Sequence, residues 1–133
     1  MMSNRSIPNC TVIPELGYPD VGEAASWLCD AFGFTLRIRI ANHRVQLNVG
    51  DGAVVVTESP EPNVLSHSVM VRVENVDEHH QRAIEHGARI VRPPTDYPFG
   101  ERQYTAQDLV GRLWTFSQSI ADVAPEEWGG TRE

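Results

Sequence analysis

One amphipathic pattern occurs twice in this chain, with its two copies 55 residues apart. The offsets are identical: the first copy comprises Val21, Ala24, Ala25, Leu28, Cys29 and Phe32, and the second comprises Val76, His79, His80, Ala83, Ile84 and Gly87. Each copy follows one strand-like run and precedes three more. Repetition on this scale indicates a duplicated supersecondary unit. We therefore predict the order β-α-β-β-β twice, with a ligand site between the two copies.

The two predicted helices carry matching start signals. Asp20 and Asn75 are good N-cap residues, and each is followed three residues later by a glutamate, Glu23 or Glu78, in a capping-box pattern. Gly33 follows the first helix, where a left-handed C-cap residue is expected. These signals place the two helices at equivalent positions of the duplicated unit.

The repeat and the chain length together favour an α+β fold in a single domain spanning residues 1–133. The first module is predicted over 10–58 and the second over 67–118, with a proline-containing linker at 59–66 and a tail at 119–133. Each helix should cover one face of its own sheet, which leaves the other two faces opposed. We therefore predict that the modules form an incomplete barrel around a cleft.

The charge balance argues against two classes of partner. A net charge of −7 disfavours nucleic acids and anionic membranes. The chain has no apolar run of about 18 residues, so no transmembrane helix is predicted. Its first residues lack the apolar core of a signal peptide, so we expect a cytoplasmic protein. Residues 1–9 are mostly polar and are expected to be loose. Cys10 and Cys29 are too few for a disulfide framework.

Strand periodicity predicts which side chains line the cleft. The valines and leucines of each strand should face the helices, and the alternate residues should face the cleft. A few polar groups in an apolar concavity are typical of a small-molecule pocket. From this alternation we predict that Glu15, Arg39, Gln46, Glu58, Met70, Arg72 and Gln103 are ligand-binding residues.

Two consecutive stretches of the second module point to a family. Residues 97–102 read Tyr-Pro-Phe-Gly-Glu-Arg, and residues 104–116 contain a strand, a turn and a last strand. This pattern resembles the Gly-x-Arg-aromatic strand and the following turn of the vicinal-oxygen-chelate superfamily, which includes glyoxalase I, extradiol dioxygenases, fosfomycin-resistance transferases and bleomycin-resistance proteins. The resemblance covers residues 10–118 and implies the paired βαβββ fold. The turn at 108–111 lacks the proline and the second acid of the family pattern.

The resemblance also implies where a metal would be held. Enzymes of this superfamily usually bind one divalent metal through four strand positions, which correspond here to Ile13, Val56, Ser68 and Thr115. The resemblance thus implies that these four residues form the floor of the cleft, and we add them to the predicted ligand-binding residues. None of these residues supplies an imidazole, carboxylate or thiolate ligand. We therefore predict no bound metal and no other cofactor.

His67 offers an alternative set of metal ligands. It lies one residue before Ser68, and a shift of one residue along a strand turns the side chain to the opposite face. We expect His67 to face away from the cleft. A displaced metal site made of Glu15, Glu58 and His67 remains the alternative.

Three features outside the metal positions bear on the cleft and on assembly. The segment 93–100 is interpreted as either a lid over the cleft or a rigid connection. Arg102 either pairs with Asp108 at the turn, which is the favoured interpretation, or contacts a ligand. Trp128, in a polar tail, needs a surface to pack on, and a partner subunit is the candidate, so we expect a homodimer.

Three classes of function are compatible with these residues. The favoured hypothesis is a non-metal binding protein of the bleomycin-resistance kind, which sequesters an antibiotic or a metabolite in the cleft. The alternative is a glyoxalase-like or dioxygenase-like metalloenzyme with a displaced metal site. The third is a structural or regulatory homodimer with an empty cleft. The sequence leaves open whether the protein is an enzyme.

Overall fold

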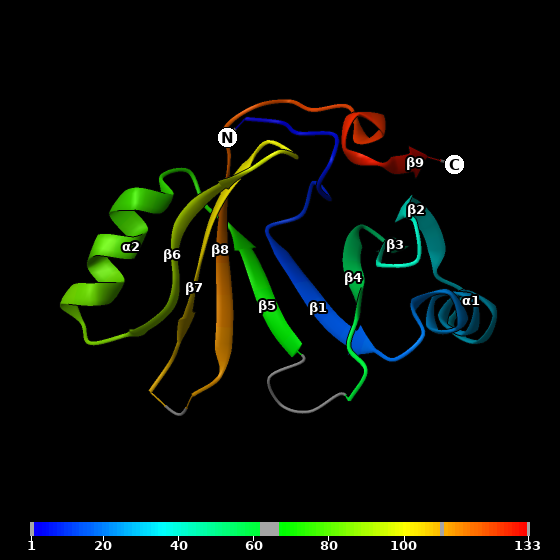
Figure 1. Cartoon of the computed structure of the whole chain (residues 1–133), viewed down its shortest axis with the longest axis horizontal. Helices are drawn as coiled ribbons and strands as arrows, with labels where there is room; N and C mark the ends of the chain where they lie inside the picture. The colour runs from blue at the N-terminus through cyan, green and yellow to red at the C-terminus, as the bar shows by residue number, and fades with distance from the viewer. Residues whose placement is uncertain (1, 62–66, 110, 133) are drawn as a thin grey trace.

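The computed structural model describes residues 2–61, 67–109 and 111–132 (Figure 1). The predicted linker at 59–66 and the predicted turn at 108–111 therefore lie partly outside the described residues. The elements are, in chain order, β1 (Val12–Tyr18), α1 (Val21–Phe32), β2 (Thr35–Ile40), β3 (Arg44–Val49), β4 (Gly52–Glu58), β5 (His67–Arg72), α2 (Val76–Glu85), β6 (Arg89–Tyr97), β7 (Glu101–Gln107), β8 (Leu113–Ser119), the 3-10 helix η2 (Pro125–Trp128) and β9 (Gly130–Arg132).

All nine of these strands belong to one open sheet, in the order β6-β7-β8-β5-β1-β4-β3-β2-β9. The two modules join at its centre, where β1 and β5 pair antiparallel and Ile13 lies opposite Met70. Within each module the first and last strands pair in parallel, β1 with β4 and β5 with β8. The predicted α+β fold and incomplete barrel are confirmed, as one continuous curved sheet with α1 and α2 at its two ends (Figure 1).

Both helices begin as their start signals predict. The Asp20 carboxylate accepts a hydrogen bond from the Glu23 amide at 2.9 Å, and the Asn75 side-chain oxygen accepts one from the Glu78 amide at 3.1 Å. Gly33 closes α1 with a φ of 77°, a left-handed conformation that glycine adopts without steric cost. In the described part of the chain, neither helix has the length and apolarity that a membrane span requires.

The core is divided between the outer faces of the two modules and the centre of the sheet. Under α1, the helix residues Val21, Ala25 and Leu28 pack against Val45, Leu47 and Val56. Under α2, the cluster is smaller and contains Val76, Tyr104 and Ala106. At the centre of the concave face, Ile13, Val55 and Met70 pack against Ile7 from the N-terminal segment. The second helix is therefore held to the sheet by fewer apolar contacts than the first.

The N-terminal segment is ordered, contrary to the prediction of a loose end. Ser6 and Ile7 are buried. The Arg37 guanidinium donates to the carbonyls of Arg5 and Ile7, and the Gln46 amide donates to the carbonyl of Ser6. Backbone carbonyls held in this way fix the segment across one end of the concave face.

The C-terminal residues are also ordered, where the sequence predicted a tail. The strand β9 pairs antiparallel with β2 at the edge of the sheet. The ring of Trp128 lies 4.8 Å from that of Phe99, and its indole N–H donates to the Ser6 hydroxyl. Trp128 therefore packs within the chain, and it no longer supports the expected homodimer.

Candidate ligand-binding cleft

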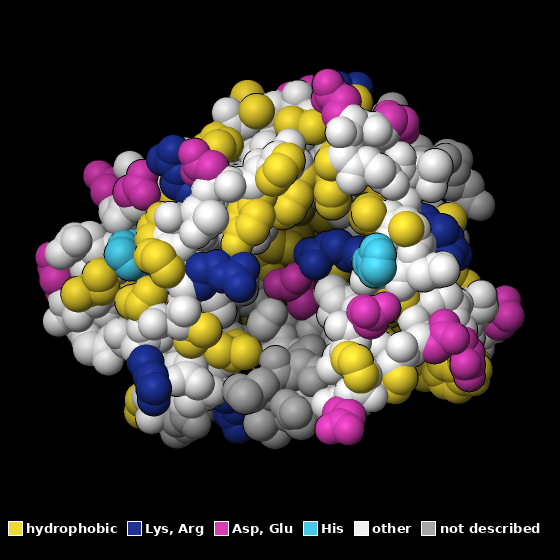
Figure 2. Space-filling model, in the orientation of Figure 1, with side chains coloured by type: hydrophobic (Ala, Val, Ile, Leu, Met, Phe, Trp, Pro, Cys, Tyr) yellow, Lys and Arg dark blue, Asp and Glu magenta, His cyan; other side chains and the backbone are white. Residues whose placement is uncertain are grey.

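The part of the concave face that the N-terminal segment leaves open forms a cleft of about 850 Å³. Figure 2 shows it as a hollow near the middle of this face, with hydrophobic side chains and charged side chains of both signs at its edges. The lining residues come from both modules: Glu15, Arg44, Thr57, Glu58, Ser59, Pro60, Glu61, His67, Ser68, Val91, Arg92, Tyr97, Phe99, Gln103, Thr105, Leu113 and Thr115.

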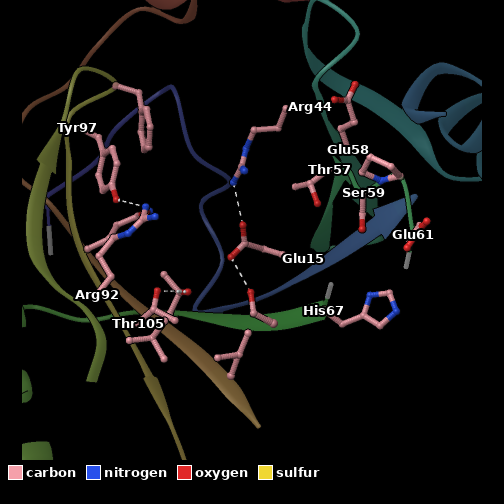
Figure 3. Close-up of a pocket in the computed structure, with 17 residues that line it drawn as sticks. Glu15, Arg44, Thr57, Glu58, Ser59, Glu61, His67, Arg92, Tyr97 and Thr105 are labelled. Carbon is pink, nitrogen blue, oxygen red and sulfur yellow. Dashed lines mark hydrogen bonds and ion pairs between the residues drawn. The ribbon is translucent and has the colours of Figure 1, made fainter. Parts of the chain in front are cut away.

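The floor of the cleft is centred on Glu15 of β1. One carboxylate oxygen accepts a hydrogen bond from Arg44 at 3.0 Å, and the other accepts one from the Ser68 hydroxyl at 3.1 Å (Figure 3). The side chains of Glu15 and Arg44 are 16% and 30% exposed, so this ion pair is shielded from solvent on most sides. A charge-assisted hydrogen bond in such a place holds both side chains in one orientation.

The wall formed by the second module is aromatic and hydroxyl-rich. Tyr97 and Phe99 stack with their ring centroids 5.4 Å apart, and the Tyr97 hydroxyl accepts a hydrogen bond from Arg92 at 2.8 Å (Figure 3). The hydroxyls of Thr105 and Thr115 are 2.9 Å apart across β7 and β8. This wall therefore offers flat apolar surface beside a few hydrogen-bonding groups.

His67 lines the cleft, although the sequence predicted that it faces away. It stands at the first residue of β5, and its Nδ1 accepts a hydrogen bond from the Gly17 amide at 3.3 Å. Because a nitrogen that accepts a hydrogen bond carries no proton, Nε2 is the ring nitrogen left to meet a ligand. The end of the strand lets the side chain turn toward the opening, which an interior residue could not do.

The structure brings five of the predicted site residues together in the cleft: Glu15, Glu58, Ser68, Gln103 and Thr115. Four others share the concave face but lie outside this opening: Ile13, Gln46, Met70 and Arg72. The N-terminal segment contacts this second group, since Arg72 donates to the Met2 carbonyl and to the Asn9 side chain. The alternation of side chains along the strands therefore predicted correctly that these four residues lie on the concave face. It could not predict that the N-terminal segment covers them.

Two predicted site residues, Arg39 and Val56, lie on the helix side. The pairing of β2 with β3 shifts between Leu36 and Ile38, so Arg37 is an extra residue and Arg39 moves to the face of its partner Val45. Val56 packs in the α1 core, whereas Val55 and Thr57 face the cleft side. The position of Val56 was predicted by counting four residues from the turn glycine Gly52, and this count was off by one residue. A shift of one residue along a strand moves the side chain to the opposite face of the sheet.

Arg44, Tyr97 and Phe99 are the main lining residues that the site prediction missed. Arg44 is two residues from Gln46, so the same alternation places both on the concave face. The aromatic pair lies in the segment interpreted as a lid or a rigid connection. Strand β6 continues to Tyr97, which pairs with Glu101, and this supports the rigid connection.

Arg102 has a structural role with partners that differ from the predicted one. It donates to Asp96 at 2.6 Å and to Asp77 at 3.0 Å, whereas Asp108 accepts from the amide of Arg112 and the indole of Trp114. The hydrogen bond from Arg102, reinforced by its charge, lowers the pKa of the Asp96 carboxyl below its usual value. These contacts join the start of α2 to the β6–β7 hairpin.

The residues at the superfamily's metal positions do not fit a metal ion. Ile13 is fully buried among apolar side chains, and the Thr115 hydroxyl is paired with Thr105. Among the described residues, no group of three or more His, Cys, Asp or Glu side chains is arranged to hold a metal. The displaced set of Glu15, Glu58 and His67 does not form such a group either, and both Glu15 oxygens already accept hydrogen bonds.

Comparison of the sequence with known protein families identifies the superfamily to which this fold belongs. The profile of the Glyoxalase/Bleomycin resistance protein/Dioxygenase superfamily matches residues 10–116. The chain belongs to this superfamily. Its turn at 108–111 departs from the pattern of this family, and so do Ile13, Ser68 and Thr115 at strand positions that the resemblance assigns to the metal. Among curated proteins, none shows significant similarity to the sequence.

Two solved structures share this fold at low sequence identity, and a third is similar in sequence. A superfamily member from Vibrio splendidus 12B01 is 22% identical, covers 80% of this chain and 97% of its own, and superposes with a TM-score of 0.61. Methylmalonyl-CoA epimerase from Mycobacterium tuberculosis is 16% identical over 90% of this chain and 94% of its own, with a TM-score of 0.67. TioX from Micromonospora sp. ML1 is 36% identical over 84% of this chain and 100% of its own, but it superposes with a TM-score of only 0.38.

Proposed function

We propose that this protein binds a small organic molecule in the cleft and sequesters it, without using a metal. The observation that carries the proposal is the floor of the cleft. There, Ser68 and Thr115 stand at two of the positions that the superfamily resemblance assigns to a metal, and the Glu15 carboxylate beside them is held by Arg44 and Ser68. A carboxylate neutralised in this way supports ligand orientation better than metal coordination.

The two walls of the cleft suit a ligand with two kinds of surface. The Tyr97–Phe99 stack offers aromatic faces, against which a planar ring packs favourably. Across the opening, Thr57, Glu58 and Arg44 offer hydrogen-bonding and charged groups. The volume of about 850 Å³ falls within the range of about 300–1,000 Å³ that is typical of small-molecule sites. A planar, polar-substituted molecule of drug-like size matches these features.

A thermal-shift screen tests the proposal directly. The protein, dialysed against a chelator, is screened against aromatic metabolites and antibiotics, with and without Ni²⁺, Zn²⁺ and Fe²⁺. A ligand present at about 100 times its Kd stabilises the native state by about 2.7 kcal/mol, which gives a clear rise in Tm. The proposal expects a shift that needs no metal, and recovery of the ligand chemically unchanged after long incubation.

Two variants locate the binding. Tyr97→Ala removes one aromatic face of the cleft and should weaken binding of the screened ligand at least about tenfold, since aromatic contacts dominate such pockets. Trp27→Ala is the matched control, because Trp27 is an aromatic residue exposed on α1, outside the cleft. Equal losses in the two variants would contradict binding in the cleft.

The displaced-metal enzyme is the second candidate, because Glu15, Glu58 and His67 all line the cleft. This candidate expects a Tm increase from metal alone, which Glu15→Gln abolishes, and conversion of the bound molecule. A shift that occurs only with metal, followed by turnover, would replace the sequestration proposal. A screen without any shift would leave the third class, a protein whose cleft binds no small molecule.

A further inference from the structure

A second cavity lies on the opposite face of the sheet from the cleft. It has a volume of about 370 Å³ and lies between α2 and the strands β7 and β8. Its lining residues alternate along these strands with those of the cleft: Val71, His79, Ala83, Ala88, Tyr104, Ala106, Gln107, Asp108, Trp114 and Phe116. Figure 1 shows α2 on the outer side of this end of the sheet. The cavity is therefore independent of the proposed function.

The sequence repeat explains why this space exists. Leu28, which fills the contact between α1 and its sheet, corresponds to Ala83 in α2. The other small residues of the lining, Ala88 and Ala106, do not compensate for the missing leucine side chain. Val76 is the one residue of α2 that is buried, against three in α1. The second module thus carries a cavity at the place where the first carries a packed side chain.

The walls of this cavity are aromatic and apolar. The rings of Tyr104 and Phe116 stack with centroids 5.1 Å apart, and the His79 ring lies 4.0 Å from that of Phe116. Two polar pairs of these walls are formed within them, since His79 Nδ1 bonds to the Tyr104 hydroxyl at 2.5 Å and the Trp114 indole donates to Asp108 at 3.1 Å. An occupant would therefore meet ring faces and methyl groups, with its contacts limited mainly to apolar packing.

Protonation equilibria agree with an apolar environment. Burial raises the pKa of the Tyr104 phenol to about 12. Burial, assisted by the positive charge of Arg82, lowers the pKa of the His79 imidazole below its usual value. Both shifts favour the neutral form, as expected where charge is poorly solvated.

We propose that the cavity under α2 is a binding site for a small, uncharged, apolar molecule with one or two aromatic rings. The size supports this class, because an apolar cavity of about 150 Å³ already admits benzene and this one is more than twice as large. The chemistry of the walls supports planar rings, which pack against the partly exposed rings of Trp114 and Phe116. A charged occupant is disfavoured because its charge would lie against ring and methyl carbons over most of the lining.

Titration with naphthalene and toluene, followed by NMR, tests the site. Saturable shifts are expected in the methyl signals of Ala83, Ala88 and Ala106, which line the cavity. The charged analogue 2-naphthoate should leave these signals unchanged. Shifts confined to residues around Tyr97 and Phe99 would place the probe in the cleft and would overturn the proposal, as would the absence of saturation.

A substitution taken from the first repeat sharpens the test. Ala83→Leu restores the residue of the equivalent α1 position and should weaken naphthalene binding about tenfold or more, because the leucine side chain occupies the space. Ala31→Leu is the matched control, since Ala31 is exposed on α1 and far from the cavity lining. Unchanged affinity in Ala83→Leu contradicts the proposal.

Self-association is the remaining way to fill the cavity, and the same experiment detects it. If a second copy of the chain occupies the space, the alanine methyl signals shift with protein concentration in the absence of probe. Naphthalene affinity would then fall as protein concentration rises. Either result overturns the small-molecule proposal, whereas concentration-independent signals with saturable probe shifts support it.

Discussion

The two helices occupy equivalent positions in the repeat, yet they pack on the sheet in different ways. In α1, Val21, Ala25 and Leu28 are buried against the strands. In α2, the corresponding residues are Val76, His80 and Ala83, and of these only Val76 is buried. Both helices begin with the same side-chain cap, so their start signals are equal. The difference therefore comes from the size and polarity of the residues facing the sheet.

This comparison shows how a duplicated fold can keep its topology while its halves diverge. Capping and strand pairing fix where each helix starts and which face it covers. The packed side chains then decide how much free energy that contact contributes. In the first module the contact is filled, whereas in the second it is left open enough to hold a cavity of about 370 Å³. Substitutions exchanged between the two repeats can test this difference.

The largest effect is expected from Leu28→Ala, which gives the first module the residue of the second. Leu28 is 6% exposed, so the substitution removes buried methyl groups and leaves a cavity. We expect the free energy of unfolding to fall by about 3 kcal/mol, as measured by urea denaturation. Ile84→Ala is the control, because Ile84 is 45% exposed and should cost less than about 1 kcal/mol. Equal losses would mean that the exposed Ile84 contributes as much packing as the buried Leu28, which contradicts the expected difference.

The reverse substitution, Ala83→Leu, should have a smaller effect of opposite sign. It adds apolar surface inside an existing cavity, so we expect the free energy of unfolding to rise by about 1 kcal/mol. The same denaturation experiment measures it beside the exposed control Ala31→Leu, which should change stability by less than about 0.5 kcal/mol. A fall in stability for Ala83→Leu would show that the walls of the cavity cannot accommodate the longer side chain.

The sequence predicted the topology of the fold better than it predicted the face on which individual strand residues lie. The element order, the cap residues and the paired modules follow from local patterns that the fold preserves. The face of Arg39 does not, because one extra residue in β2 reverses the alternation beyond Arg37. The face of Val56 was missed because the count began at a turn and not at a paired strand residue.

The extent of the cleft depended on contacts between residues far apart in the sequence. Alternation placed Met70 and Arg72 on the concave face, where they lie, but the N-terminal segment crosses that end of the sheet. A polar segment containing Asn4 and Ser6 gives no local signal of burial, since its partners are Glu101 and Gln46, distant along the chain. Long-range hydrogen bonding of this kind cannot be inferred from periodicity.

The charged pairs of the two modules provide a second comparison. Glu15 and Arg44 are mostly shielded from solvent, whereas Arg102 and Asp96 lie at the surface, where Asp96 is 55% exposed. A double-mutant cycle on Glu15→Gln and Arg44→Gln should give a coupling free energy of about 1 kcal/mol. Because screening acts mainly on exposed charges, this coupling should persist in 1 M NaCl, while that between Arg102 and Asp96 should disappear. Equal salt sensitivity would show that the cleft pair is solvated.

The smallest expected effect is a pH dependence confined to the second module. Burial, with the charge of Arg82, lowers the pKa of His79, so the unfolded chain binds this proton more readily than the folded one. The contribution of His79 to stability is therefore fully present above the ordinary histidine pKa of about 6.5 and is lost as the pH falls through the folded value. The corresponding residue of α1 is Ala24, which cannot titrate.

Thermal unfolding of the wild type and of His79→Gln between pH 8 and pH 5 measures this contribution. The difference in Tm between the two proteins should narrow as the pH falls, because protonation removes the advantage of the neutral imidazole bonded to Tyr104. Gln81→Ala, an exposed change on the same helix, should give a difference that is constant with pH. A constant difference for His79→Gln as well would mean that His79 is solvated in the folded protein, and the space beneath α2 would then be wetter than its apolar walls indicate.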